Sequence, residues 1–163
     1  YLVSTEDPLS FYLLGTLYEA HYKDYPKAEE YYQKAIELNI PRGYNGLGNL
    51  YQYHFKDREK AKEYYEKAIE LGVNYAYNSI GVLYETHYNN YEKAIECFEK
   101  AIELGVSDAY YNLAMVYHGE RNNEKAIEYY EKACEFNKDA YNKLGLLHYF
   151  CYFSWGNLLQ DGL

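Results

Sequence analysis

One short motif recurs about every 33 residues, and this repetition constrains the fold more than any other feature of the sequence. Each copy begins with an apolar residue followed by a small one, and the copies read LGTLY, LGNLY, IGVLY, LAMVY and LGLLH. The small residue of each copy, called the repeat small residue below, is Gly15, Gly48, Gly81, Ala114 or Gly145. Self-similarity with a period of roughly 20–50 residues is the signature of units that stack on their neighbours. The sequence therefore predicts a repeat solenoid.

A second motif follows each of the first four copies and reads KAxEYYxKAIEL in its fullest form. Its two alanines are seven residues apart, so they lie on one face of a helix, where small side chains let another helix approach closely. The alanine pairs are Ala28/Ala35, Ala61/Ala68, Ala94/Ala101 and Ala126/Ala133. Each unit is therefore predicted to be a helix A that carries the first motif, a short loop, and a helix B that carries the second.

Residues that favour helix ends flank the second motif in every copy. Asp or Asn, whose side chains cap helix N-termini, stands four residues before the first alanine, at Asp24, Asp57, Asn90 and Asn122. Asn or Gly, which tolerates the left-handed conformation that ends helices, stands four residues after the second alanine, at Asn39, Gly72, Gly105 and Asn137. We predict A helices near residues 8–21, 42–54, 75–87, 108–119 and 139–153, and B helices near residues 25–38, 58–71, 91–104 and 123–136.

The two motifs together resemble the tetratricopeptide repeat family, and in particular its Sel1-like branch. The family pattern L-G-x-x-Y is matched by Leu14-Gly15-Tyr18 and its equivalents, and the segment DAYYNLAMVY (108–117) is especially similar to Sel1-like repeats. The period is one residue shorter than the usual period of about 34, and helix A lacks the early tryptophan of the family. The resemblance implies an all-α fold, a right-handed α-solenoid of helix-turn-helix repeats. About four and a half repeats would fill residues 1–153, with residues 154–163 as a tail or cap.

The composition excludes several classes of function. Lys and Arg number 16 against 25 Asp and Glu, so the formal net charge is −9 at pH 7. This balance argues against nucleic acid and anionic membranes as partners, because both require a basic surface, and no apolar run is long enough for membrane insertion. Three cysteines without framework spacing indicate a reducing compartment and hence the cytoplasm. The chain opens with YLVSTEDPLS, with neither Met nor a signal pattern, as expected of an excised or processed piece.

The resembled fold has two unlike surfaces, because helix A lines a concave groove and helix B faces outward. Each B helix has a Glu four residues before a Lys, which is the favourable spacing for a solvated helical ion pair. The pairs are Glu30/Lys34, Glu63/Lys67, Glu96/Lys100 and Glu128/Lys132. We therefore expect helix B to form a solubilising outer face and helix A to carry the function.

Residues around the repeat small residue are expected to line the groove, and they are mostly amides and aromatic residues. Amides donate and accept hydrogen bonds, so a ladder of them can pair with the backbone of a ligand. Tyr supplies rigid apolar area with a polar tip. The candidate binding residues are Tyr12, Arg42, Asn45, Asn49, Gln52, Asn78, Ser79, Tyr111, Asn112, Asn142 and Lys143. The alternative is that the Asn side chains only satisfy neighbouring backbone groups within the stack.

Two known binding modes, a carboxylate clamp and a phosphate loop, do not fit the sequence of this face. The carboxylate clamp of the resembled family needs several cations beside Asn, whereas Arg42 and Lys143 are the only cations placed on this face. Gly43, Gly46 and Gly48 form G-x-x-G-x-G and not the G-x-G-x-x-G of a phosphate loop. These glycines are expected instead to thin one wall of the groove.

No constellation of residues indicates an enzyme, a cofactor or a metal site. His21, His54 and His87 each lie six residues after a repeat small residue, so their spacing follows from the solenoid. Stacked helices are about 8–10 Å apart, too far for a shared zinc ion with ligand distances of about 2 Å. These histidines are expected to lie in the loops between helices A and B. Cys97 and Cys134 occupy positions held by Tyr and Ile in other copies and are predicted to be core residues.

The C-terminal end, residues 144–163, carries more apolar residues than one helical stripe can bury against the fourth repeat. Large uncovered apolar patches are uncommon on soluble monomers. We therefore predict self-association through Phe150, Phe153 and Trp155. The alternatives are burial by the rest of a longer parent protein, by a tail that folds back, or by a short capping helix in a monomer.

These patterns predict a non-enzymatic interaction module that binds a peptide or protein segment in its concave groove, as a scaffold or adaptor. The alternative is an architectural or self-associating repeat module of a larger protein, whose groove is filled by its own chain or by a second subunit.

Overall fold

The computed structural model describes residues 7–136, which form eight α-helices and two π-helical turns and contain no strand. In chain order the elements are α1 (Pro8–Leu17), η1 (Tyr18–Tyr22), α2 (Tyr25–Glu37), α3 (Arg42–Leu50), η2 (Tyr51–Phe55), α4 (Arg58–Glu70), α5 (Ala76–Tyr88), α6 (Tyr91–Glu103), α7 (Asp108–Gly119) and α8 (Asn123–Phe136). These helices end within one residue of the predicted bounds when each π-helical turn is counted with its helix. The predicted helix at 139–153 and the tail at 154–163 lie outside the described residues.

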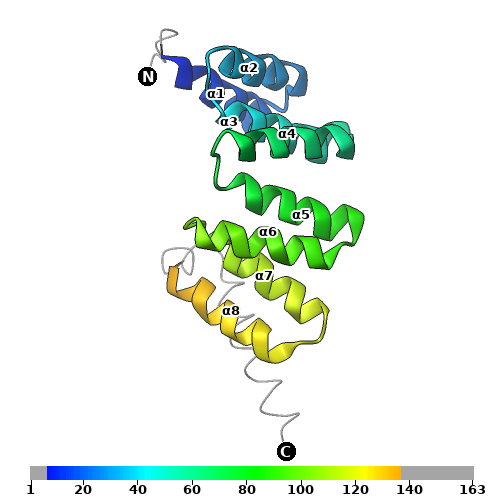
Figure 1. Ribbon diagram of the computed structural model, residues 1–163. Helices are drawn as coiled ribbons and strands as arrows, with labels where there is room; N and C mark the ends of the chain where they lie inside the picture. The colour runs from blue at the N-terminus through cyan, green and yellow to red at the C-terminus, as the bar shows by residue number, and fades with distance from the viewer. Residues whose placement is uncertain (1–6, 137–163) are drawn as a thin grey trace, which may run out of the picture.

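The helices form four hairpins that stack along one axis, from α1–α2 at one end to α7–α8 at the other (Figure 1). Each A helix (α1, α3, α5, α7) packs on the B helix of its own repeat, and α3, α5 and α7 also pack on both helices of the preceding repeat. Neighbouring B helices (α2, α4, α6, α8) make at most marginal contact with one another. Because the stack is tighter along the A helices, these helices line its inner, concave side. The prediction of an all-α solenoid of helical repeats is confirmed.

The helix ends form as the sequence predicts. The side chains of Asp24, Asp57, Asn90 and Asn122 accept hydrogen bonds from the backbone N–H three residues later, at N···O distances of 3.0–3.3 Å. Asn39, Gly72 and Gly105 follow α2, α4 and α6 with φ of 60°, 81° and 82°. Each cap satisfies backbone groups that the helix itself leaves unpaired.

The corner between helix A and helix B differs between the first three repeats and the fourth. The N–H groups of Asp24, Asp57 and Asn90 donate to the carbonyl six residues earlier, whereas Asn122 donates to Tyr117, five residues earlier. The fourth repeat has one residue fewer between its repeat small residue and its first alanine. The additional residue of the other repeats is thus accommodated by a wider hydrogen bond at the end of helix A, which gives the π-helical turns η1 and η2 in the first two repeats and a single wide bond after α5 in the third.

Each B helix buries one aromatic ring against the A helix of its own repeat, and the first of these rings also packs against the A helix of the second repeat. The rings are those of Tyr32, Tyr65, Phe98 and Tyr130. A Cβ atom at Gly15 would lie 2.5 Å from the Tyr32 ring, and one at Gly46 would lie 2.6 Å from the same ring. The repeat small residue is therefore small because a helix backbone lies directly on the ring.

The expectation that Gly43, Gly46 and Gly48 thin a wall of the groove is wrong. All three are buried, and a Cβ atom at Gly48 would lie 2.4 Å from the ring of Tyr65. At Gly43 it would lie 2.8 Å from the backbone oxygen of Tyr32. These glycines let α3 approach the B helices on both of its sides.

The outer face carries ion pairs, although not all of the predicted ones. Lys34 pairs with Glu30 and Lys132 with Glu128, as predicted. In the two middle repeats the lysines pair instead with the Glu three residues later, as Lys67–Glu70 and Lys100–Glu103. The prediction fails there because each lysine has a Glu on both sides at helical spacing, and exposed partners differ little in energy.

Candidate functional site

The candidate binding residues differ in how far the fold leaves them accessible. Six of them are half-buried on the A helices: Tyr12, Asn49, Asn78, Ser79, Tyr111 and Asn112. Arg42 is exposed. Asn142 and Lys143, and the predicted self-association residues Phe150, Phe153 and Trp155, lie outside the described residues.

Two candidates, Asn45 and Gln52, are 4% and 1% exposed, so the prediction that they line an open groove is wrong. Gln52 is held inside by Tyr65, whose hydroxyl donates to Gln52 Oε1 at 2.7 Å. The Gln52 amide therefore makes its hydrogen bond inside the stack. The alternative interpretation expected such amides to bond to the backbone, whereas the partner of Gln52 is a tyrosine hydroxyl.

Two of the predicted amides meet between repeats three and four. Nδ2 of Asn112 donates to Oδ1 of Asn78 at 2.8 Å, which joins α7 to α5. Each amide has two N–H donors and a carbonyl with two lone pairs, so this single bond leaves most of their hydrogen-bonding capacity unused. Both side chains are half-buried and stay within reach of a ligand.

The buried ring of helix B is coupled to the concave face through its hydroxyl, a relation that the sequence analysis missed. Tyr32 donates to Glu19 Oε2 at 2.6 Å, and the one hydroxyl proton of Tyr65 is shared between Gln52 Oε1 at 2.7 Å and Asn49 Oδ1 at 2.8 Å. Glu19 and Gln52 both lie four residues after the repeat small residue. The signal that could have revealed the coupling is a core Tyr together with a polar residue at that position, which holds in the first two repeats, whereas the Tyr130 hydroxyl of the fourth donates to the sulfur of Met115 at 3.0 Å.

The third repeat lacks this coupling. Phe98 takes the place of the tyrosine and has no hydroxyl, while Glu85 stands at the position of Glu19 and Gln52. Within the range 7–136, Glu85 has neither a hydrogen bond nor an ion pair, and its side chain is half-buried. Burial raises the pKa of the Glu85 carboxyl above its ordinary value, with no charged neighbour to oppose the rise.

Glu19 has a second contact that ties the first repeat to the second. Nε2 of His54 lies 3.4 Å from Glu19 Oε1, and the imidazole stacks on the ring of Tyr25 with centroids 3.9 Å apart. His54 therefore packs at a junction between repeats, and its neighbours are a carboxylate and a tyrosine. Among the described residues, no group of three His, Cys, Asp or Glu side chains could hold a metal ion.

Arg42, the first residue of α3, makes a contact that joins the second repeat to the third. Its guanidinium carbon is 5.9 Å from the centroid of the Tyr75 ring, a cation–π contact between α3 and the residue that precedes α5. Burial, followed by the influence of Tyr12, raises the pKa of Tyr75. Tyr12, Arg42 and Tyr75 thus bring the first three repeats together, and Tyr75 was not among the candidates.

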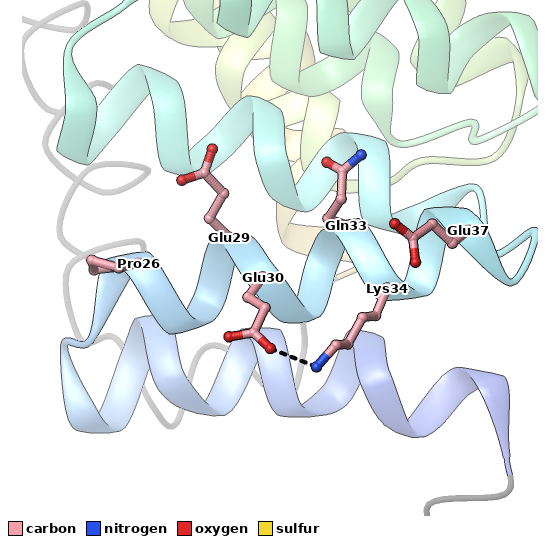
Figure 2. A pocket seen from close by; sticks show the side chains of 6 residues that line it. All are labelled: Pro26, Glu29, Glu30, Gln33, Lys34 and Glu37. Atoms are coloured by element: carbon pink, nitrogen blue, oxygen red, sulfur yellow. Dashed lines mark hydrogen bonds and ion pairs between the residues drawn. The ribbon is translucent and has the colours of Figure 1, made fainter.

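A shallow depression on α2 is a poor candidate for a site. Figure 2 shows that all of its lining side chains come from that one helix: Pro26, Glu29, Glu30, Gln33, Lys34 and Glu37. Lys34 is already paired with Glu30, and Glu29 accepts a hydrogen bond from Tyr51 at 2.6 Å. The concave face is the better candidate because several repeats contribute to it. Over residues 7–136, no helix is both long and apolar enough to cross a bilayer.

The sequence matches known repeats over most of its length. Residues 41–71, 75–104 and 107–140 match the tetratricopeptide repeat, and residues 10–40 match the Sel1 repeat. The three tetratricopeptide matches cover more than half of the chain, which therefore belongs to the tetratricopeptide repeat family. Repeats of this kind are generally protein–protein interaction modules and are typically not enzymes.

Solved structures share the fold at low sequence identity. BtubC (BKLC) from P. vanneervenii is 20% identical with a TM-score of 0.67, and the match covers 80% of this chain and 62% of that one. A protective antigen of uropathogenic Escherichia coli with an SLR fold is 28% identical with a TM-score of 0.64, over 79% of this chain and 30% of that one. The present chain thus spans less than two thirds of the length of these two proteins.

A third structure is YrrB, described as a tetratricopeptide repeat protein with an unusual peptide-binding site. It is 21% identical with a TM-score of 0.60, over 90% of this chain and 79% of that one. Among curated proteins, none matches the sequence.

Proposed function

We propose that the concave face of α1, α3, α5 and α7 binds an extended peptide or protein segment, and that the chain acts as a scaffold or adaptor. The observation that carries this proposal is the linked pair Asn78 and Asn112, half-buried on neighbouring A helices with unused donors and acceptors. Such groups can pair with a peptide backbone regardless of its side chains. The structural likeness to YrrB, a protein with a peptide-binding site, supports the proposal by analogy of fold.

Aromatic residues on the same face add apolar contact area. Tyr111 lies against the Tyr130 ring with centroids 5.9 Å apart, and Tyr12 lies at the same centroid distance from Tyr32. Rings held by packing lose little conformational freedom when they bind. The face therefore combines pre-positioned hydrogen-bonding groups with rigid apolar surface, as peptide interfaces do.

The test is selection of peptides from a phage-displayed library of random dodecapeptides, followed by fluorescence anisotropy with the selected synthetic peptides. The double variant Asn78→Ala, Asn112→Ala is expected to weaken binding by about 1–3 kcal/mol, because peptide groups lose their partners. Gln33→Ala, at an exposed position of α2, is the matched control and should bind as the wild type does. Failure to select any peptide, or equal affinity of the double variant, would contradict the proposal.

A second candidate function is an architectural module that associates end to end. It is favoured by an exposed apolar residue on α1. Leu17 is 44% exposed, whereas Leu50, Leu83 and Val116, the equivalent residues of the other repeats, are 0%, 0% and 2% exposed. In those repeats the preceding repeat covers the position. Another helix pair could cover Leu17 in the same way.

Light scattering distinguishes the two ends at which such association could occur. Leu17→Glu should abolish association through α1, and the double variant Phe153→Glu, Trp155→Glu should abolish association through the predicted C-terminal surface. A wild-type chain that is monomeric at tens of micromolar would contradict self-association through either end.

We also propose a reducing, cytoplasmic setting. Cys97 and Cys134 are free thiols, and burial raises the pKa of the Cys97 thiol to about 11, which keeps it protonated and unreactive at neutral pH. Unpaired cysteines are typical of such compartments.

A further inference from the structure

We propose that Glu85 anchors a subsite on the concave face that takes a positively charged side chain, Lys or Arg, of the bound segment. This inference rests on the proposed function, since it names the chemistry of the segment that the face would bind. The observation that carries it is a difference in the core ring of helix B. This ring is a tyrosine in the first two repeats, where it bonds to the residue four positions after the repeat small residue, and it is Phe98 in the third.

The fold gives Glu85 the same place as two residues whose partners are known. Glu19 and Gln52 lie four residues after their repeat small residues, and each accepts a hydroxyl hydrogen bond from the buried ring of the same repeat. Phe98 supplies the corresponding ring in the third repeat and is fully buried. Its ring carbons would be 2.6–3.1 Å from a Cβ atom at Gly81, so the ring sits on its repeat small residue as those of Tyr32 and Tyr65 do. Only the hydroxyl is missing.

The missing hydroxyl leaves a carboxylate without a donor in a partly dry environment. Glu85 is half-buried, and among residues 7–136 it makes neither a hydrogen bond nor an ion pair. Removing an ionised group from water without compensation is unfavourable, and a carboxylate can accept several hydrogen bonds. A cationic group from a ligand would supply both the charge and the donors.

The surroundings of Glu85 on the helices favour a long side chain with a charged end. Val82 lies one turn before Glu85 on the same helix and is half-buried, and Met115 stands at the equivalent position of the next repeat and is exposed. Lys and Arg place aliphatic stems along such apolar surface while the charged group reaches a polar partner. A neutral polar side chain would leave the carboxylate charge uncompensated.

The chain offers no cation of its own to Glu85 within the described part. Arg42 contacts Tyr75, which lies ten residues before Glu85 and thus about 15 Å away along the helix. The net charge of −9 further favours a basic segment over an acidic one, because long-range attraction concentrates opposite charge near the surface.

The test uses the full chain and the same library of random dodecapeptides, selected in parallel on the wild type and on Glu85→Gln. Peptides selected on the wild type are expected to share a Lys or Arg, and those selected on Glu85→Gln are expected not to. Replacing that Lys or Arg by norleucine should weaken binding to the wild type roughly 10-fold to 100-fold, the range for charge-assisted hydrogen bonds. The same replacement should change binding to Glu85→Gln by less than about 2-fold.

Phe98→Tyr is a second, independent variant, because its new hydroxyl would donate to Glu85 as Tyr32 does to Glu19. It should weaken binding of the basic peptides while its thermal unfolding shows an intact fold. Glu96→Gln, at an exposed position of α6, changes the net charge by the same amount as Glu85→Gln and serves as the control. It should bind as the wild type does.

The outcomes separate the two proposals. Selected peptides that bind through Asn78 and Asn112 but lack a basic residue, or are insensitive to Glu85→Gln, would overturn the Glu85 subsite and leave the proposed function standing. Equal losses for Glu96→Gln and Glu85→Gln would show only general attraction to an acidic protein and would also overturn it. Failure to select any peptide would overturn both.

Discussion

The second and third repeats each consist of one helix pair and each bury one aromatic ring, but only the ring of the second repeat carries a hydroxyl. Tyr65 ends in a hydroxyl that reaches Gln52 and Asn49 on the concave side. Phe98 ends in the ring, and Glu85 above it has no partner among residues 7–136. One oxygen atom in the core thus decides whether the polar residue four positions after the repeat small residue has a hydrogen-bond donor beneath it.

The core and the concave face of the solenoid are therefore not independent. The ring that fills the space beneath the repeat small residue also decides whether the residue four positions later is occupied. Gln52 is drawn inside and is lost to any ligand, whereas Glu85 stays half-buried and free to bind one. Candidate binding residues of such a repeat therefore have to be judged together with the core ring of the same repeat.

The largest expected effect is common to both repeats. Tyr65→Ala and Phe98→Ala should each lower the free energy of unfolding by about 3–5 kcal/mol, because both rings are fully buried and their loss leaves a cavity. Urea denaturation monitored by circular dichroism measures the change, with the exposed Glu63→Ala expected within about 0.5 kcal/mol of the wild type. A cost below 1 kcal/mol for either ring would mean that it does not hold the stack together.

A smaller effect should distinguish the two repeats. Tyr65→Phe removes the donor to buried Gln52, whose Nε2 has no partner among residues 7–136 either, and should cost about 1–3 kcal/mol of unfolding free energy. The reverse change, Phe98→Tyr, should cost less because its hydroxyl gains Glu85 as an acceptor. The same urea titrations measure both, and equal costs would show that the hydroxyl does not distinguish the repeats.

The smallest expected effect depends on pH. Burial raises the pKa of Tyr65 well above its ordinary value of about 10. As the pH approaches and passes about 10, the unfolded chain releases a proton that the folded chain keeps, so the free energy of unfolding falls as the pH rises. This one group should lower it by about 0.4 kcal/mol at pH 10. Tyr65→Phe should remove this part of the loss, which unfolding midpoints near neutral pH and near pH 10 would reveal. An unchanged pH dependence would place the Tyr65 hydroxyl in water.

The repeating pattern predicts the helices and their ends because these depend on contacts a few residues apart. The four N-caps and the left-handed residues at Asn39, Gly72 and Gly105 form as the sequence predicts. The π-helical turns are not predicted, since the additional residue of the first three repeats could have lengthened the loop instead of widening the helix.

The candidate site is predicted less completely, for a physical reason that Gln52 and Asn78 illustrate. Both are amides on the side of helix A that the pattern assigns to the groove. Gln52 is buried and bonded to the Tyr65 hydroxyl beneath it, whereas Asn78 is half-buried and bonded to Asn112 on the next A helix. The amphipathic pattern of helix A gives the direction of each side chain but not the reach of the ring beneath it.

The fold class, the lengths of the helices within residues 7–136, the N-cap residues and the alanines at which helices approach could all be predicted from the sequence. These follow from local geometry and from the equivalence of the repeats. The packing of the helices was needed to show which glutamate each outer lysine pairs with, that Asn45 and Gln52 are buried, and that Glu85 has no donor among residues 7–136. Those outcomes depend on distances between side chains of different helices, and one hydroxyl group is enough to change them.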